Sequence, residues 1–175
     1  MIPIPSPLHP AVVHFPIVLL LLGAPIAVIA ALLPKWHLPR LAAALLVAGS
    51  LGAIAATWTG GQDEELLGEL PQPAEQILEE HEEWGATTRN ISIAAAILAS
   101  LAAALFRHPR TSRVLAVFAA ITAVGAAFAV SQAGHYGGLL VYKHGAGVNT
   151  TSSSGPDTQN RTTSEKKPGH RGEDD

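Results

Sequence analysis

Cysteine is absent from the 175-residue sequence. Its absence excludes disulfides, thiolate metal sites, cysteine-held iron–sulfur clusters and covalent c-type haem attachment within this chain. A metal ion or a haem iron would therefore have to be held by histidine nitrogen or by oxygen.

Charge is also scarce, and it is unevenly distributed. Charged residues make up 14% of the chain, against about a quarter in soluble domains. Nine of the 14 acidic residues lie in residues 63–83, and the other five lie from Asp157 onward. There is no basic stripe of the kind that contacts phosphates, so the sequence indicates no nucleic-acid partner.

Long charge-free stretches occupy most of the remaining chain. Four of them lack Asp, Glu, Lys and Arg altogether: residues 11–33, 41–62, 90–106 and 114–142. A helix needs about 20 apolar residues to cross a bilayer, and the third stretch reaches this length only with residues 84–88. Alanine and leucine dominate without period-two alternation, which favours helices over strands. The sequence predicts an all-α bundle of four transmembrane helices in residues 1–148 and a disordered polar tail at 149–175.

The short connections predict the orientation of this bundle, because lysine and arginine are retained on the cytoplasmic side. Lys35 and Arg40 lie between the first two stretches, and Arg107, Arg110 and Arg113 lie between the last two. The middle connection is acidic. We therefore expect both termini and the acidic connection outside.

The acidic segment 74–84, AEQILEEHEEW, follows two prolines and is typical of a helix that can continue into the third span. His81 stands there among four glutamates, which could bind a cation. A solvated acidic helix is the simpler interpretation.

Histidine is the residue type that carries candidate chemistry. His37 and His108 lie in the basic connections and His170 lies in the tail, where we interpret them as solvated. The other five map to the acidic side of the predicted bundle: His9, His14, His81, His135 and His144. At a rise of about 1.5 Å per residue, counted from the basic side, His14 and His135 would lie at nearly the same height in the bundle. An ionisable side chain inside a membrane costs free energy, so its presence there suggests a functional role.

Level histidines on facing helices are the arrangement that binds haem iron or a transition metal through neutral imidazole nitrogen. Haem needs one pair, whereas zinc or copper needs three or four ligands. The alternative is structural: interfacial histidines can bridge headgroups, water and free backbone carbonyls. No serine has histidine and carboxylate partners readable from spacing, so no catalytic residue is indicated.

The segment HPAVVHFP at residues 9–16 predicts an irregular helix start. Pro10 suits a first helical turn, but Pro16 has no N–H, so the Val12 carbonyl would lose its partner in a helix that began at Pro10. The helix either starts near Pro16 or is broken beside His14.

Small residues recur at every fourth position in two of the predicted spans. The rows are Ala48, Gly52 and Ala56 in the second span and Gly125, Ala129 and Ala133 in the fourth. In lipid such rows are interfaces that let helix backbones approach closely. Chance in alanine-rich spans explains them equally well.

Two strings of the sequence resemble the ends of a known family. LHPAVVHFPIVLL at 8–20 and GGLLVYKHGAGV at 137–148 are similar to the opening and closing motifs of a bacterial four-helix membrane family, catalogued as domain of unknown function twenty-two thirty-one. TWTGGQD and EEHEEWG stand at the expected places between them. The resemblance covers about residues 7–148.

The resemblance ranks the histidines. His9 and His14 match the opening motif, His81 the middle histidine and His144 the closing motif, whereas His135 matches no family position. The family often has a glutamate where this chain has leucine at 139 or 140, so a carboxylate role there is not supported. Relatives fused to or neighbouring cytochrome domains imply a connection with haem or electron transfer.

We therefore predict a component of a membrane redox system in the bacterial cytoplasmic (inner) membrane. Its cofactor would be b-type haem or a transition metal, bound by the outer-side histidines, and its partner a cytochrome or another membrane redox protein. Electron transfer or ion delivery would occur without substrate turnover by this chain alone. The alternative is a non-catalytic assembly or partner subunit with structural histidines. A transporter is disfavoured, because no span carries an acidic residue.

Overall fold

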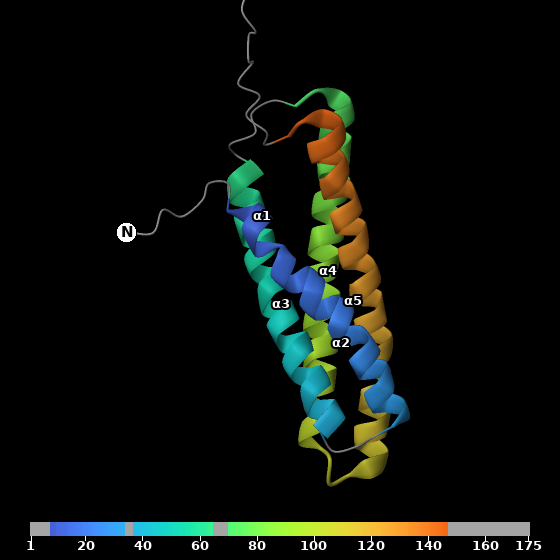
Figure 1. Ribbon diagram of the computed structural model, residues 1–175. Coiled ribbons are helices and arrows are strands. Elements are labelled where there is room, and N and C mark those ends of the chain that lie inside the picture. Colours follow the sequence, from blue (N-terminus) through green and yellow to red (C-terminus); the bar gives the residue numbers. More distant parts are fainter. Residues whose placement is uncertain (1–7, 34–36, 65–69, 147–175) are drawn as a thin grey trace, which may run out of the picture.

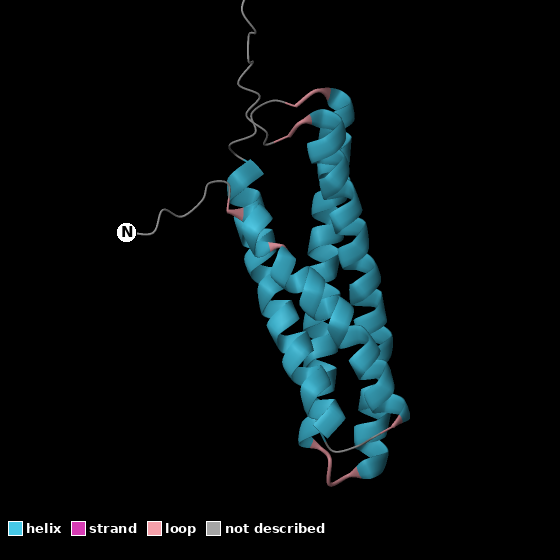
Figure 2. Ribbon diagram, in the orientation of Figure 1, coloured by secondary structure: helices cyan, strands magenta, loops and turns pink. Residues whose placement is uncertain are grey.

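The computed structural model describes residues 8–33, 37–64 and 70–146. Within these ranges the chain forms α1 (His9–Val12), α2 (His14–Leu32), α3 (His37–Glu64), α4 (Gln72–Ala104) and α5 (Pro109–His144), and no strand. The long helices run alternately in opposite directions along an elongated bundle (Figures 1 and 2). With α1 and α2 counted together, four helical segments are long and apolar enough to cross a membrane. This confirms the predicted all-α, four-helix fold, whereas the predicted tail at 149–175 lies outside the described residues.

The helices form a closed ring. Each long helix packs against its neighbour in the chain, and α2 also packs against α5, while α1 packs mainly on α3. The connections from α2 to α3 and from α4 to α5 share one end of the bundle, which we call the basic end. The opposite end, where α1, the end of α3 and the start of α4 lie, is called the acidic end (Figure 1).

Helix α4 confirms that the acidic segment continues into the third span. It runs unbroken from Gln72 to Ala104, because Pro71 and Pro73 stand only at its start, where a missing N–H costs no hydrogen bond. The five glutamates of its first three turns are exposed. The apolar half of the helix is therefore preceded by a polar extension beyond the membrane-spanning part.

The start of α2 is broken beside His14, as one of the two sequence interpretations required. α1 ends at Val12, and the Val13 N–H donates to the His9 carbonyl at 3.0 Å. Pro16 is buried, and a Cβ added to Gly52 of α3 would lie 3.0 Å from its Cδ. The break lets α1 follow α3 toward the acidic end.

Alanine dominates the buried core, and the two fully buried leucines fit into glycines of the opposite helix. Leu20 of α2 lies over Gly49 of α3, where an added Cβ would be 2.8 Å from its Cδ2. Leu46 of α3 lies over Gly23 of α2 in the same way, at 3.1 Å. This reciprocal packing holds α2 and α3 together through close backbone approach, which is the main source of helix association in lipid.

The two predicted small-residue rows differ in outcome. In α5, Ala129 and Ala133 are buried, as an interface requires. In α3, Ala48 is exposed, so the predicted row is wrong at its first position. The buried face of α3 passes instead through Gly49 and Ala53, because it faces both α2 and α4 and is wider than a single row.

The surface of the membrane-spanning part is apolar, and two hydroxyl groups of α5 are satisfied within that helix. Large side chains such as Leu51, Ile121 and Phe128 are exposed along the bundle. Thr122 donates to the Phe118 carbonyl at 2.9 Å and Ser131 to the Ala127 carbonyl at 2.8 Å. These bonds let polar side chains stand in lipid without an unsatisfied donor.

We predict that Gly49→Ala destabilises the bundle by about 1–3 kcal/mol, because the new methyl overlaps a leucine that has no room to move. The measurement is reversible unfolding of the purified protein in mixed detergent micelles. Gly61→Ala is the matched control, since nothing lies within 4 Å of its added Cβ, and it gains about 1 kcal/mol of helix propensity. Equal effects of the two changes would contradict the packing described here.

Candidate functional site

His9 is anchored to α3 by three contacts. Its backbone N–H donates to Asp63 Oδ2 at 2.7 Å. Its Nδ1 lies 2.8 Å from the Ala56 carbonyl oxygen. Its ring lies against the backbone at Gly60, where an added Cβ would be 3.2 Å from both Cε1 and Nδ1. The short helix α1 therefore holds one imidazole at a defined place on the acidic end of α3.

His81 is anchored to α5 in the same manner. Its Nδ1 lies 2.8 Å from the Ala133 carbonyl oxygen. A Cβ added to Gly137 would lie 3.0 Å from Cε1 and 3.2 Å from Nδ1 of its ring. Gly137 follows Ala133 by one helical turn, as Gly60 follows Ala56. Both halves of the chain therefore place a histidine in the same way, with its ring against a glycine and its Nδ1 at the carbonyl one turn earlier.

The two imidazoles meet between the halves of the bundle. Their ring centroids lie 5.9 Å apart, and the ring planes are inclined by 87°. Along their helices, both side chains stand about 35 Å from the basic end, just beyond a hydrocarbon layer of about 30 Å. The pair therefore lies near the acidic end of the bundle.

The hydrogen bonds define the tautomer of both rings. A carbonyl oxygen can only accept, so Nδ1 of His9 and of His81 carries the proton and donates it to the backbone. In the neutral ring Nε2 then has a free lone pair. A backbone carbonyl that holds Nδ1–H is the usual outer contact of a metal-binding histidine.

Burial favours the neutral form of His81. Desolvation lowers the pKa of its imidazole, the Ala133 carbonyl opposes this shift, and the nearby His9 adds a smaller lowering. A neutral imidazole is the form that binds a metal.

The other three histidines predicted as ligands do not join this pair. His14 and His135 are exposed, and the His135 ring contacts the Tyr136 ring with 5.5 Å between centroids. His144 is half-buried at the end of α5, and among the described residues its Nε2 has no hydrogen-bond partner. The structure thus unites two of the five candidates.

Sequence reasoning missed the residues that seat the two rings, although a signal was present. Both small-residue rows continue by one more step, from Ala56 to Gly60 and from Ala133 to Gly137. The rows therefore end on the glycines against which the imidazoles lie. The partner of each glycine was unreadable, because it comes from about 50 residues away in the chain.

Two carboxyl groups at the acidic end form a hydrogen-bonded pair: that of Glu64 at the end of α3 and that of Glu82, which follows His81 in α4. A side-chain hydrogen bond with Glu64, together with burial and the negative charges of Glu64 and Glu79, raises the pKa of Glu82 to about 7. Glu82 precedes the charge-free part of α4, so it lies outside the membrane-spanning segment. At neutral pH the Glu82 carboxyl is therefore about half protonated.

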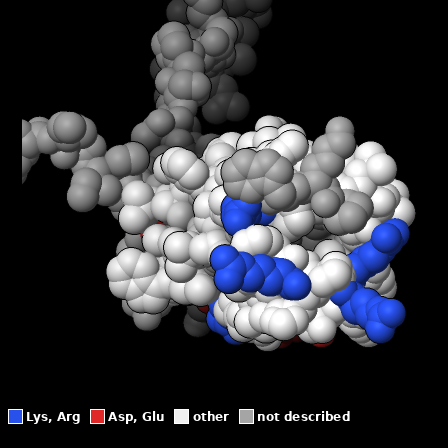
Figure 3. Space-filling view, turned by 90° about the horizontal axis from the view of Figure 1, so that it is seen from below, with Lys and Arg blue, Asp and Glu red and all other residues white. Residues whose placement is uncertain are grey.

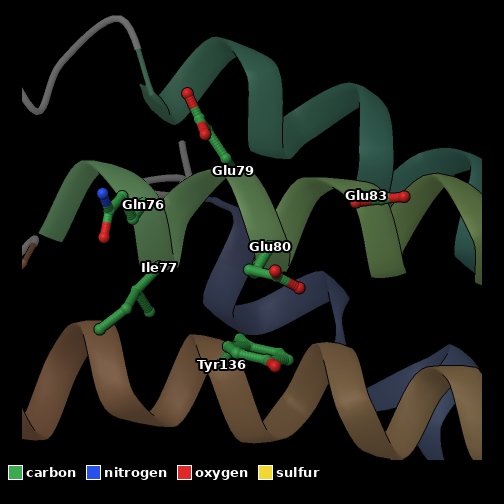
Figure 4. Close-up of a pocket in the computed structure, with 6 residues that line it drawn as sticks. All are labelled: Gln76, Ile77, Glu79, Glu80, Glu83 and Tyr136. Carbon is green, nitrogen blue, oxygen red and sulfur yellow. The ribbon is translucent and has the colours of Figure 1, made fainter. Parts of the chain in front are cut away.

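A shallow hollow of about 420 Å³ lies between α4 and α5 at the same end. Figure 4 shows Ile77 and Glu80 pointing toward Tyr136, whereas Glu79 and Glu83 point away from it. Throughout residues 8–33, 37–64 and 70–146, no group of three or more histidine, aspartate or glutamate side chains is arranged to hold a metal ion.

These features define a four-helix membrane protein with two imidazoles paired at its acidic end. The chain belongs to the family described as predicted membrane protein (DUF2231), whose model matches residues 5–150. The resemblance found in the sequence motifs is thereby confirmed. No curated protein and no solved structure matches the chain.

We predict that the stabilisation contributed by Glu82 falls as the pH rises from about 4.5 to 7, through its shifted titration. The folded protein binds this proton more tightly than the unfolded chain, so the stabilisation is complete below the ordinary pKa of 4.5 and is lost as the pH approaches 7. The measurement is the melting temperature of the wild type minus that of Glu82→Gln, from pH 4.5 to 8.

Taking the difference between the two proteins removes the contribution of the histidines, which titrate in the same range. Glu83→Gln is the control, because it removes the neighbouring carboxyl of the same helix, which is not among the groups that shift the pKa of Glu82. If the wild type and Glu82→Gln showed parallel curves, the raised pKa of Glu82 would be disproved.

Proposed function

We propose that this protein is a haem-binding component of a membrane redox system, with His9 and His81 as the ligands of one b-type haem. The observation that carries the proposal is the paired imidazoles, 5.9 Å between centroids, each with Nδ1 bonded to a backbone carbonyl. Two separate halves of the chain supply them by the same construction.

The number and kind of donors fit haem better than a free metal ion. Zinc and copper sites in proteins need three or four ligands, and the described residues offer no such group. A bis-imidazole haem needs two.

Each neighbouring group has a defined part in this proposal. A bound haem would supply one-electron transfer. The Ala56 and Ala133 carbonyls hold the protons of Nδ1, which keeps Nε2 of both rings available as a donor. Gly60 and Gly137 leave the space that the rings occupy. Asp63 fixes the start of α1, and with it the position of His9.

The other three histidines predicted from the sequence are weaker candidates for haem ligands. His144 ranks next, because its buried Nε2 is unpartnered among the described residues. His14 and His135 are exposed and rank last. They serve as controls below.

The proposed setting is the bacterial cytoplasmic membrane, with the acidic end and both termini outside. Arginines at the basic end support this orientation, because basic connections are retained in the cytoplasm. The haem would then lie at the outer surface, within reach of a cytochrome or another membrane redox partner. No catalytic turnover is assigned to this chain alone.

We expect protein purified from haem-replete membranes to contain close to one haem per chain and to show an absorption band that shifts on reduction. His9→Ala and His81→Ala should each reduce the haem content at least tenfold, since removing either imidazole would leave a single donor. The measurement is haem and iron content per chain, with circular dichroism to verify folding.

His135→Ala is the matched control, and its haem content should equal that of the wild type. Gly137→Ala keeps both imidazoles but displaces the His81 ring, and should lower the haem content less than His81→Ala. Wild-type protein that is colourless and free of stoichiometric metal would refute the redox proposal.

The second candidate function is a non-catalytic assembly or partner subunit, in which the histidines are structural. The same hydrogen bonds favour it, because each imidazole joins two helices: α1 with α3, and α4 with α5. On this alternative, His9→Ala and His81→Ala lower the melting temperature of a protein that contains no haem.

The orientation has its own test. A reporter that is active only outside the cytoplasm should be active when inserted between Glu64 and Leu70, and inactive when inserted at Arg110. Reporter activity at both positions, or at neither, would rule out the arrangement of four crossings.

A further inference from the structure

Arg89 places a positive charge within the apolar part of α4. It is the only lysine or arginine in residues 41–106. The other described arginines belong to the basic end, where Figure 3 shows the blue side chains gathered. A charged side chain at membrane depth costs free energy unless it meets a counter-charge or reaches polar surroundings, so this position calls for an anionic partner.

Two tryptophans give the level of the nearby membrane surface. A Cβ added to Gly85 of α4 would lie 3.9 Å from Cγ2 of Thr57 of α3. The adjacent Trp84 and Trp58 therefore stand at one level of the bundle. Trp58 is 66% exposed, and indole rings favour the boundary between headgroups and hydrocarbon. Arg89 follows Trp84 in α4, and its Cα lies roughly 7 Å deeper in the membrane.

No acidic side chain neutralises this guanidinium within the part of the chain that the structure describes. Its Nε donates to Asn90 Oδ1 at 3.2 Å, in a hydrogen bond that is exposed on the outside of the bundle. Arg89 forms no ion pair with any described residue. The nearest preceding acid of α4, Glu83, stands about 9 Å away along the helix axis. The remaining N–H donors of Arg89 are therefore free to bind an anion from outside the protein.

Helix geometry leads the Arg89 side chain back toward the membrane surface. The Cα–Cβ bonds of a helix tilt toward its N-terminus, and α4 begins at the acidic end (Figure 1). A long arginine side chain keeps its stem in hydrocarbon while its charged head reaches the headgroups. The guanidinium can therefore reach the level of Trp58 and Trp84, where lipid phosphates begin.

We propose that Arg89, with Asn90 beside it, binds the phosphate of a phospholipid in the leaflet at the acidic end. A planar guanidinium presents a fork of N–H donors that matches phosphate oxygens, and the Asn90 amide adds N–H donors next to it. A lipid is favoured over a soluble anion, because the arginine is rooted below the level of the tryptophans and its hydrogen bond to Asn90 faces outward. The site needs no cofactor, so it does not depend on haem at the histidine pair.

The test is native mass spectrometry of the full chain, released from detergent that contains phosphatidylglycerol or a glycosyl diacylglycerol with the same acyl chains. The second lipid has no phosphate. The wild type should retain phosphatidylglycerol in preference. Arg89→Gln should reduce this preference about fivefold, the effect of one basic residue near a membrane surface.

Arg113→Gln is the matched control, because it removes the same charge from an exposed position at the opposite end. It should keep most of the preference. Arg89→Lys keeps the charge but loses the fork of donors, so its preference should lie between those of the wild type and Arg89→Gln. Circular dichroism verifies that each variant is folded.

Three outcomes would overturn the proposal. In the first, the wild type retains both lipids equally. In the second, Arg89→Gln and Arg113→Gln lose the preference to the same extent, which would indicate general surface charge. In the third, excess inorganic phosphate displaces phosphatidylglycerol from the wild type, which would assign the site to a free anion.

Discussion

Close backbone approach through small side chains is the interaction on which this bundle depends. Lipid tails are as apolar as leucine, so burying apolar surface drives helix association far less than in water, and van der Waals packing must replace it. The core accordingly consists mostly of alanine, and its two largest fully buried side chains, Leu20 and Leu46, lie over glycines of the opposing helix. Bulky side chains face outward, where lipid surrounds them.

Close approach over small residues also positions the candidate site. At the acidic end the small-residue rows of α3 and α5 each finish on a glycine, and an imidazole rather than a leucine occupies the space above it. Because Gly60 and Gly137 bring the rings against the helix backbones, the carbonyls one turn earlier come within 2.8 Å of Nδ1. Packing thus sets both the place and the tautomer of each histidine.

The two ends of the bundle carry different kinds of polar and charged side chains. The acidic end combines the histidine pair with carboxyl groups, among them Glu82 with its raised pKa. The basic end combines arginines with the phenyl ring of Phe106. Between them lies an apolar span in which Thr122 and Ser131 donate to carbonyls of their own helix, so that these hydroxyls need no other partner.

Much of the fold could be predicted from the sequence, since lipid imposes a simple requirement of about 20 uncharged residues per crossing. The four spans, the continuation of residues 74–84 into α4 and the break beside His14 followed from charge, proline and helix geometry. The small row of α3 was predicted on the wrong face at Ala48, because a helix with neighbours on two sides buries more than one row.

The sequence by itself determined that the chain crosses a membrane four times, and that five histidines lie toward one side of it. Only the tertiary structure decided which of them meet. Rise along a helix gives the height of a side chain but not its direction around the bundle, so the two histidines predicted to be level, His14 and His135, are not the two that meet. The ring of helices, with α2 against both α3 and α5, turns His9 and His81 inward and leaves the other two exposed, because contacts between residues about 70 positions apart depend on packing that no local pattern encodes.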